Sequence, residues 1–261
     1  MTRFGFVGVG RMGSALLKGF ISRGLIEPSN VLAYDKDPDA LEKAGVASKY
    51  SAFEVVQESD VVFLCVKPKD MEDVLDEIED IAGSRLIVSI AAGVKTKAIE
   101  KRLKEARVIR VMPNTPAVIY ELAAAYCLGK RAGEEDSVLV GSLLNSIGIA
   151  FKVEEKHMDA VTGLSGSGPA YVYYIIRALT EAGVKEGLDE KTSHNLVLQT
   201  IRGSVDMVIT TKKSPEELID EVKSPGGTTE EGLKKLEALK VGKSLVDAVH
   251  AATLKSKKLG K

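Results

Sequence analysis

Two patterns of apolar residues divide the chain into two parts. Up to about residue 155, short apolar runs with the length of strands alternate with segments of helical spacing. The runs are residues 3–8, Val31–Tyr34, Asp60–Val66, Arg85–Ile90, Val108–Met112, Ala123–Leu128 and Ile149–Val153. Beyond about residue 155 these runs disappear and long helical stripes replace them. The pattern predicts an α/β region followed by an all-α region.

The first part has the pattern of a parallel sheet. Unbroken apolar runs are typical of parallel strands that helices cover on both faces. Helical spacing is found in Met71–Ile81 and Thr96–Lys104, and a further helix is expected to carry Val138, Leu139, Leu143 and Ile147. Strands that alternate with helices predict βαβ units and a doubly wound sheet with its ligand loops along one edge. We assign residues 1–155 to this domain.

The second part, residues 156–261, is expected to be helical throughout. A helix should begin at Pro169, and its first two turns, Ala170–Ile176, are apolar or aromatic nearly all round, so we expect it to be buried. Further stripes are formed by Val197, Ile201, Val205 and Val208, and by Leu245, Val246, Val249 and Ala252. Burial against a second subunit and packing inside a helical bundle explain this pattern equally well.

Composition narrows the class of partner. The 261 residues include 36 basic and 37 acidic ones, for a net charge of −1, so neither nucleic acid nor an anionic membrane is expected to bind. No signal peptide is apparent, and the apolar run Phe4–Val9 is too short to span a membrane. Cys65 and Cys127 are therefore expected to be reduced thiols in the cytoplasm. The three histidines lack the spacing of ligands, and no metal is expected.

A glycine-rich turn lies between the first strand and the first helix. Its residues are Gly8, Val9, Gly10, Arg11, Met12 and Gly13, in the pattern GxGxxG. The glycines permit a tight turn and the close approach of a pyrophosphate, whose charge the helix N-terminus favours. The strand before the turn and the helix after it favour a dinucleotide site over a chance glycine turn.

The end of the second strand bears on the choice of cofactor. Asp35 stands 22 residues after Gly13, where a carboxylate can accept hydrogen bonds from the ribose hydroxyls of NADH. The same carboxylate would repel the 2′-phosphate of NADPH unless Lys36 neutralised it. The alternative for Asp35 is an Asx turn before Pro38. The cofactor is thus expected to be NADPH or NADH.

Other strands end in residues that we also assign to the cofactor. These are Val66, Lys67 and Pro68 after one strand, Ala91, Ala92 and Gly93 after the next, and Asn114 after a third. Small residues at a strand end let a ligand ring lie close to the backbone. Lys67 is a candidate acid, although Pro68 favours a role for the backbone turn.

A second glycine-rich segment stands near the C-terminal end of the chain. Ser224-Pro225-Gly226-Gly227-Thr228-Thr229 precedes a run with helical spacing at Leu233, Leu236 and Leu239. Backbone amides at such a helix N-terminus can hold a small carboxylate. The alternative is a helix that Thr228 or Thr229 caps after a tight turn.

Together these segments resemble the pyrroline-5-carboxylate reductase family. The matching pieces, in the order of that family, are Gly8–Gly13, Cys65–Pro68, Ile90–Gly93, Val111–Pro116, Leu164–Tyr171 and Val222–Gly232, which cover nearly the whole chain. Leu-Ser-Gly-Ser-Gly-Pro-Ala-Tyr and Ser-Pro-Gly-Gly-Thr-Thr are far more specific than GxGxxG. Asp35-Lys36 departs from the NADPH-adapted pair common in the family, which leaves the cofactor preference open.

The resemblance implies a Rossmann domain, an all-α dimerisation domain, a homodimer and higher assemblies such as a decamer. It implies reduction of 1-pyrroline-5-carboxylate to L-proline, the last step of proline synthesis, by hydride transfer from NADPH or NADH. The substrate carboxylate would lie at Ser224, Gly226, Gly227, Thr228 and Thr229, with Thr229 near the ring nitrogen as the catalytic residue. Ser167 and Gly168 are further candidates for the substrate pocket, although capping of the helix at Pro169 is an equal alternative for them.

Two competing functions are consistent with parts of the sequence. Another Rossmann reductase could act on a hydroxy acid or on a different cyclic imine, but no lysine motif of the hydroxy acid enzymes is evident. A protein that only senses NAD(H) would leave the loop at 224–229 without a purpose. Reduction of 1-pyrroline-5-carboxylate accounts for both glycine-rich segments.

Overall fold

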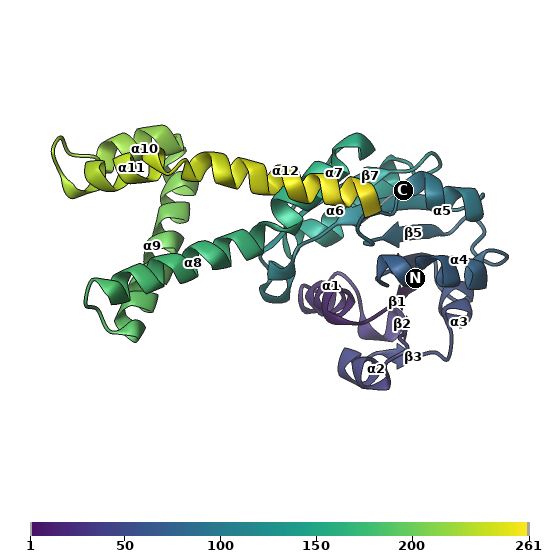
Figure 1. Ribbon diagram of the computed structural model, residues 1–261. Helices are drawn as coiled ribbons and strands as arrows, with labels where there is room; N and C mark the ends of the chain where they lie inside the picture. Colours follow the sequence, from purple (N-terminus) through teal and green to yellow (C-terminus); the bar gives the residue numbers. More distant parts are fainter. Residues whose placement is uncertain (1, 260–261) are drawn as a thin grey trace. The chain divides into compact units, whose positions relative to one another are not determined.

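A computed structural model describes residues 2–259, and its N-terminal part contains an eight-stranded mixed sheet (Figure 1). The strands are β1 (Phe4–Val7), β2 (Val31–Tyr34), β3 (Ala47–Ser48), β4 (Val61–Leu64), β5 (Leu86–Ser89), β6 (Arg107–Met112), β7 (Leu122–Leu128) and β8 (Gly148–Lys152). Their spatial order is β3-β2-β1-β4-β5-β6-β7-β8. The first six are parallel, β7 is antiparallel to β6, and β8 is parallel to β7. The predicted doubly wound fold is confirmed.

Helices cover the sheet on both faces. They are α1 (Arg11–Ser22), α2 (Pro38–Ala44), α3 (Ala52–Gln57), α4 (Met71–Ile78), α5 (Thr96–Arg102) and α6 (Glu134–Asn145). Alternate strand residues point to opposite faces. Phe6 and Phe63 therefore stack at 4.8 Å in one core cluster, while Val62 and Leu64 belong to a second cluster with α3 and α4. The continuous apolar strands arise from this double covering.

Three helices differ in extent from the prediction. Helix α4 ends at Ile78 rather than Ile81, because the chain turns there toward Gly83, which has a φ of +49°. Helix α5 ends at Arg102, since Leu103 already has a non-helical ψ of 74°. Ile147 lies beyond α6, in the turn before β8, although it still packs into the core.

By internal contacts the chain forms two compact units. Unit 1 comprises residues 2–169 and 249–259, and unit 2 comprises residues 170–248. The remaining helices are α7 (Met158–Val161), α8 (Gly168–Lys185), α9 (Glu190–Thr211), α10 (Pro215–Val222), α11 (Thr228–Ala238) and α12 (Val241–Leu259). In unit 2, α8 and α9 approach closely at Gly183, where a Cβ would lie 2.2 Å from the hydroxyl of Ser193.

Of the two explanations for the apolar helix at Pro169, packing inside a bundle of the single chain is wrong. Helix α8 has no buried residue, and the side chains of Tyr173 and Tyr174 are 60% and 65% exposed. The apolar positions were identified correctly, but an internal bundle does not cover them. A helix that is apolar nearly all round and yet exposed lacks the surface that it would pack against.

Candidate active site

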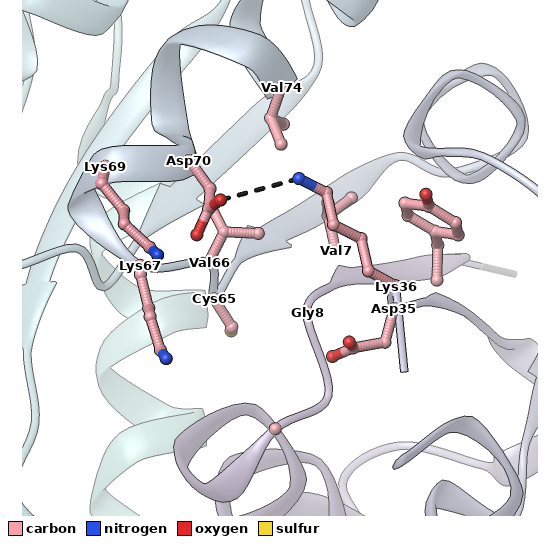
Figure 2. Close-up of a pocket in the computed structure, with 12 residues that line it drawn as sticks. Val7, Gly8, Asp35, Lys36, Cys65, Val66, Lys67, Lys69, Asp70 and Val74 are labelled. Carbon is pink, nitrogen blue, oxygen red and sulfur yellow. Dashed lines mark ion pairs between the residues drawn. The ribbon is translucent and has the colours of Figure 1, made fainter. Parts of the chain in front are cut away.

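One hollow of unit 1 lies where the strand order reverses. Strand β1 pairs with β2 on one side and with β4 on the other, and Val7 is level with both Tyr34 and Leu64. The next residues along these strands are Gly8, Asp35 and Cys65, all at carboxyl ends. Open α/β sheets bind ligands at such a switch point. The hollow has a volume of about 270 Å³ and is lined by Val7, Gly8, Gly10, Tyr34, Asp35, Lys36, Cys65, Val66, Lys67, Lys69, Asp70 and Val74 (Figure 2).

The geometry of the glycine-rich turn explains its composition. Gly8 has a φ of +94°, and a Cβ there would lie 2.9 Å from the carbonyl group of Cys65. A Cβ at Gly13 would lie 2.2 Å from the carbonyl oxygen of Gly8, so helix and strand pack too closely for a side chain. At Gly10, by contrast, a Cβ would meet nothing within 4 Å. The turn is rigid on its inner side and open where a pyrophosphate would approach, which fits a dinucleotide.

Asp35 is held in place by two backbone donors. Its Oδ2 accepts a hydrogen bond of 2.7 Å from the Val9 N–H, and its Oδ1 accepts one of 3.0 Å from the Asp37 N–H. The second bond is the predicted Asx turn, which therefore coexists with a place in the hollow. The first bond ties the end of β2 to the glycine-rich turn. Asp35 thus presents a fixed carboxylate to the hollow.

Four further charged side chains surround the hollow. Lys36 Nζ lies 3.6 Å from Asp70 Oδ1, and Figure 2 shows this lysine extended toward Asp70 while the Asp35 carboxylate lies near Gly8. Lys67 and Lys69 also line the hollow, and neither forms an ion pair within residues 2–259. The site therefore carries both signs of charge at its mouth.

Cys65 contributes a neutral thiol. Burial within the surrounding protein, and secondarily the charge of Asp35, raise the pKa of Cys65 well above its usual range. A thiol with a raised pKa stays protonated at neutral pH and is a poor nucleophile. Cys65 is half-buried, and its side chain also lines the hollow.

Several predicted cofactor residues lie outside the lining, and several lining residues were not predicted. Outside it are Val9, Arg11, Met12, Gly13, Pro68, Ala91, Ala92, Gly93 and Asn114. The prediction stopped at the strand ends and missed Lys69 and Asp70 in the short 3₁₀ turn Pro68–Asp70. Their signal was available, since Pro68 after Lys67 already indicates that the chain turns across the edge of the sheet.

Asn114 connects three segments of unit 1. Its side chain is buried, with Oδ1 accepting a 3.0 Å bond from the Ala123 N–H and Nδ2 donating at 3.2 Å to the carbonyl of Ser165. Ser165 belongs to a π-helical turn, Thr162–Gly166. Such turns are frequent at functional sites. Asn114 thereby holds the specific Leu-Ser-Gly-Ser-Gly segment against the end of the sheet.

The two other candidates of that segment differ from each other. Ser167 donates through its hydroxyl to the carbonyl of Thr162 at 3.1 Å, so it closes the π-helical turn rather than capping the helix that follows. At Gly168 a Cβ would meet nothing within 4 Å. The backbone of Gly168 is therefore open, whereas the Ser167 hydroxyl is already engaged.

The carboxylate loop, Ser224–Thr229, leads into helix α11 in unit 2. Gly226 has a φ of +70°, and the Gly227 N–H donates to the carbonyl of Ser224 at 2.9 Å. Gly227 is the N-cap, and no side chain caps the helix. The alternative that Thr228 or Thr229 caps it is therefore wrong, because both lie inside the first turn. No residue of the described chain accepts a hydrogen bond from the N–H of Thr228 or Thr229.

The side chain of Glu230 folds back onto this loop and binds its backbone. Its Oε2 accepts a 2.6 Å hydrogen bond from the Gly226 N–H, and its Oε1 lies 3.3 Å from Lys234 Nζ. Thr229, half-buried, also lines an apolar hollow of about 400 Å³ between α9, α10 and α11. Free amides at a helix N-terminus, with partial positive charge, can bind an anion.

Residues 2–259 include no helix long and apolar enough to cross a bilayer. In the same residues no group of three or more His, Cys, Asp or Glu side chains is placed to hold a metal ion.

Comparisons with known proteins agree with this geometry. The family model for pyrroline-5-carboxylate reductase dimerisation matches residues 155–259, which indicates a homo-oligomer. A model described as NADP oxidoreductase, coenzyme F420-dependent, matches residues 3–93. Pyrroline-5-carboxylate reductase of Methanosarcina acetivorans is 40% identical, with 99% of this chain and 98% of that protein covered. That of Glycine max is 42% identical, with 98% and 95% covered.

A solved structure extends the likeness to three dimensions. Pyrroline carboxylate reductase of Plasmodium falciparum with NADP bound has a TM-score of 0.93 and 38% identity, over 100% of this chain and 98% of that one. The similarity thus includes the glycine-rich turn, the helical unit and the carboxylate loop. This chain belongs to the pyrroline-5-carboxylate reductase family, as its motifs predicted.

Proposed function

We infer that this enzyme reduces 1-pyrroline-5-carboxylate to L-proline with NADPH or NADH, the last step of proline biosynthesis. The observation that carries the inference is membership of the family over nearly the full chain, with identities near 40%. Two local features support it: a dinucleotide-type hollow at the switch point of the sheet and a helix N-terminus with free amides.

The cofactor residues have separable tasks. The turn Gly8–Gly13 would receive the pyrophosphate, and Asp35 would accept hydrogen bonds from the adenosine ribose. Strand-end residues Val66–Pro68 and Ala91–Gly93 would lie along the cofactor toward its nicotinamide. Asn114 would act through the loop that it holds rather than through its side chain, whose polar atoms are both engaged. When bound, the reduced nicotinamide supplies the hydride for the imine carbon.

The substrate carboxylate would bind at the start of α11. The N–H groups of Thr228 and Thr229 are free donors there, whereas those of Gly226 and Gly227 are engaged within the loop. Ser224 can add a hydroxyl, and Gly168, whose backbone is open, is kept as a proposed substrate contact. Donors fixed by the fold need no reorganisation when the anion binds, so the ring is held in one orientation.

Placement should contribute more to the rate than proton donation. Alignment of donor and acceptor can contribute about 7 to 11 kcal/mol, whereas a positioned acid contributes about 3 to 5 kcal/mol. Thr229 is a poor acid, and we assign its hydroxyl a hydrogen bond to the imine nitrogen. A water molecule can deliver the proton through it. Ser167 would act at a distance, by closing the π-helical turn.

The assembly extends the proposal. We propose a homodimer formed by residues 156–261, with residues 1–155 as the cofactor domain and larger oligomers such as a decamer built from dimers. The exposed apolar residues of α8 support this arrangement. We keep the cytoplasm as the proposed location, since Cys65 and Cys127 are free thiols.

One assay tests the activity. Oxidation of NADH and NADPH is followed at 340 nm with 1-pyrroline-5-carboxylate, its six-membered homologue and a 3-hydroxy acid. The expected result is turnover of 1-pyrroline-5-carboxylate at a kcat/KM at least tenfold above the other two. A higher value for either alternative would replace the proposed substrate.

A second experiment tests the carboxylate loop. Thr229→Ala should lower kcat by about 10²-fold and leave measurable turnover, because the backbone amide remains. Thr228→Ala is the matched control and should change kcat less than about threefold, since only its N–H is assigned a role. Complete loss of turnover in a folded Thr229→Ala variant would make the hydroxyl essential and our weighting wrong.

A further inference from the structure

The adenosine end of the cofactor hollow contains an ion pair whose position bears on cofactor choice. Lys36 follows Asp35 directly at the end of β2, and Asp70 ends the 3₁₀ turn after β4. Their side chains meet across the mouth of the hollow at 3.6 Å (Figure 2). The Lys36 side chain is 65% exposed and that of Asp70 is 30% exposed. Both therefore belong to the rim that a ribose substituent would reach.

Asp35 makes the ribose subsite negative and rigid. Its two oxygens accept from Val9 and Asp37, so the carboxylate cannot turn away when a ligand arrives. A fixed carboxylate suits two ribose hydroxyls, which donate hydrogen bonds to it. A 2′-phosphate at the same place brings two negative groups within a few ångströms, which is unfavourable unless a cation lies between them.

Lys36 is the cation nearest to Asp35 in the chain, and Asp70 holds it elsewhere. Figure 2 shows its ammonium group on the Asp70 side of the hollow, away from the Asp35 carboxylate. While this ion pair persists, Asp70 neutralises the charge of Lys36. It also keeps the ammonium group away from the Asp35 side of the hollow, where a 2′-phosphate would need a cation. An exposed pair is weak, so its effect should be a moderate bias rather than an absolute barrier.

We propose that Asp70 is a positioning residue for cofactor choice: by holding Lys36, it makes this enzyme prefer NADH over NADPH. The proposal rests on the proposed function, because it concerns the same dinucleotide site. It goes further in naming the preferred cofactor and the residue that acts through another. Lys67 and Lys69 have no ion pair in the described residues and are available to either cofactor.

Asp70→Asn tests the proposal, with Asp73→Asn as its control. Both remove one negative charge near the start of α4, but Asp73 is exposed and outside the lining. Dissociation constants for NAD⁺ and NADP⁺ are measured by titration calorimetry without substrate, beside kcat/KM for NADH and NADPH. Asp70→Asn should raise the preference for the phosphorylated cofactor about 3- to 10-fold in both measurements, and Asp73→Asn should not change it.

A double variant shows whether Lys36 carries the effect. In the Asp70→Asn background, Lys36→Gln should return the cofactor ratio to within about twofold of the parent. Asp35→Ser should shift the ratio further than Asp70→Asn, by about 10- to 100-fold, because it removes both the ribose acceptor and the repulsion. Thermal unfolding of each variant excludes a change of fold.

The outcomes separate this proposal from the proposed function. If the parent enzyme prefers NADP⁺ and NADPH, or if Asp70→Asn leaves both ratios unchanged, the proposal is wrong whatever the activity. If the ratios shift as expected but 1-pyrroline-5-carboxylate is not reduced, the role of Asp70 stands and the proposed substrate is wrong.

Discussion

The two units are stabilised in different ways. Unit 1 has a core cluster on each face of its sheet, and Phe6, Phe20 and Phe63 are fully buried there. In unit 2, residues 170–248, only Ser193 is buried, although its helices carry many large apolar side chains. Unit 1 therefore buries a core of large apolar side chains within one chain. Unit 2 does not, which agrees with the match of its region to a dimerisation family.

The comparison also explains where each half can bind a ligand. In unit 1 the sheet fixes three strand ends side by side, and the hollow follows from strand order. In unit 2 the proposed binding groups are backbone amides at one helix terminus, so any element that shifts α11 would shift the proposed site. We therefore expect substrate binding to depend on assembly more strongly than cofactor binding does.

The largest expected effect comes from placing a charge on α8. Tyr174→Asp should convert the oligomer toward monomer and lower kcat/KM more than about 100-fold, because a carboxylate buried in an apolar interface costs several kcal/mol. Tyr174 is 65% exposed in the single chain and α8 has no buried residue there, so helix content should be preserved. Light scattering measures the mass of the assembly, and circular dichroism measures the helix content. The oxidation assay measures kcat/KM.

Tyr50→Asp is the control in unit 1. Tyr50 is 92% exposed, more than Tyr174 at 65%, and it lies outside the helical unit. The variant should keep the mass and activity of the parent. An active oligomer formed by Tyr174→Asp would mean that this face of α8 is not covered by a second copy, and the comparison of the two units would fail.

The glycine-rich turn offers a matched pair for unit 1. Gly13→Ala places a Cβ 2.2 Å from the backbone of Gly8 and should lower the unfolding free energy by about 1 to 3 kcal/mol and weaken dinucleotide binding about 100-fold. Gly10→Ala has free space and a φ of −62°, so its stability should be unchanged while its affinity falls. For each variant, thermal unfolding measures the stability and titration calorimetry measures the dinucleotide affinity. A stable, tightly binding Gly13→Ala variant would contradict the close packing of helix on strand.

Unit 1 was predictable because its signals are local and repeated. Apolar runs such as Asp60–Val66 are long enough to contain the observed strand, Val61–Leu64, and helices separate them. Strand β3 was missed, since its two residues, Ala47 and Ser48, are both exposed and carry no apolar signal. Helices α2 and α3 were also missed, although their N-cap residues Asp37 and Ser51 provided a usable signal.

The sites were predictable only in their backbone motifs. Both glycine-rich segments were found, because unusual backbone geometry needs glycine. The bond of Asp35 to the Val9 N–H and the pairing of Lys36 with Asp70 were not, since these contacts join residues far apart in the chain. Exposure of α8 could not be predicted for a related reason: spacing identifies an apolar face, but it does not say which surface covers it.

A smaller effect concerns the thiol in the cofactor hollow. Because the pKa of Cys65 is raised, less of it is thiolate at pH 8, and iodoacetamide should alkylate it at least about tenfold more slowly than free cysteine. The rate should rise with pH, and NAD⁺ should slow it further by covering the hollow. Burial also raises the pKa of Cys127 to about 12. The Cys127→Ala variant removes this second thiol, so all alkylation that is then measured occurs at Cys65. Rapid alkylation at pH 8 would contradict a buried neutral thiol.

The smallest expected effect tests whether the negative charge of Glu230 weakens substrate binding at the carboxylate loop. Glu230→Gln keeps an oxygen that can accept from the Gly226 N–H, but it removes a charge beside the amides of Thr228 and Thr229. The KM for 1-pyrroline-5-carboxylate should fall about 2- to 4-fold with kcat unchanged, since the helix terminus then favours an external anion more strongly. Glu231→Gln removes a similar charge that makes no bond to the loop, and it should have a smaller effect. Glu230→Ala removes the acceptor as well, so the loop loses its tie at Gly226 and KM should rise. If Glu230→Gln and Glu230→Ala raise KM equally, the ionised carboxylate itself holds the loop. The binding loop of unit 2 would then be shaped by a charge, whereas the glycine-rich turn of unit 1 is shaped by backbone packing.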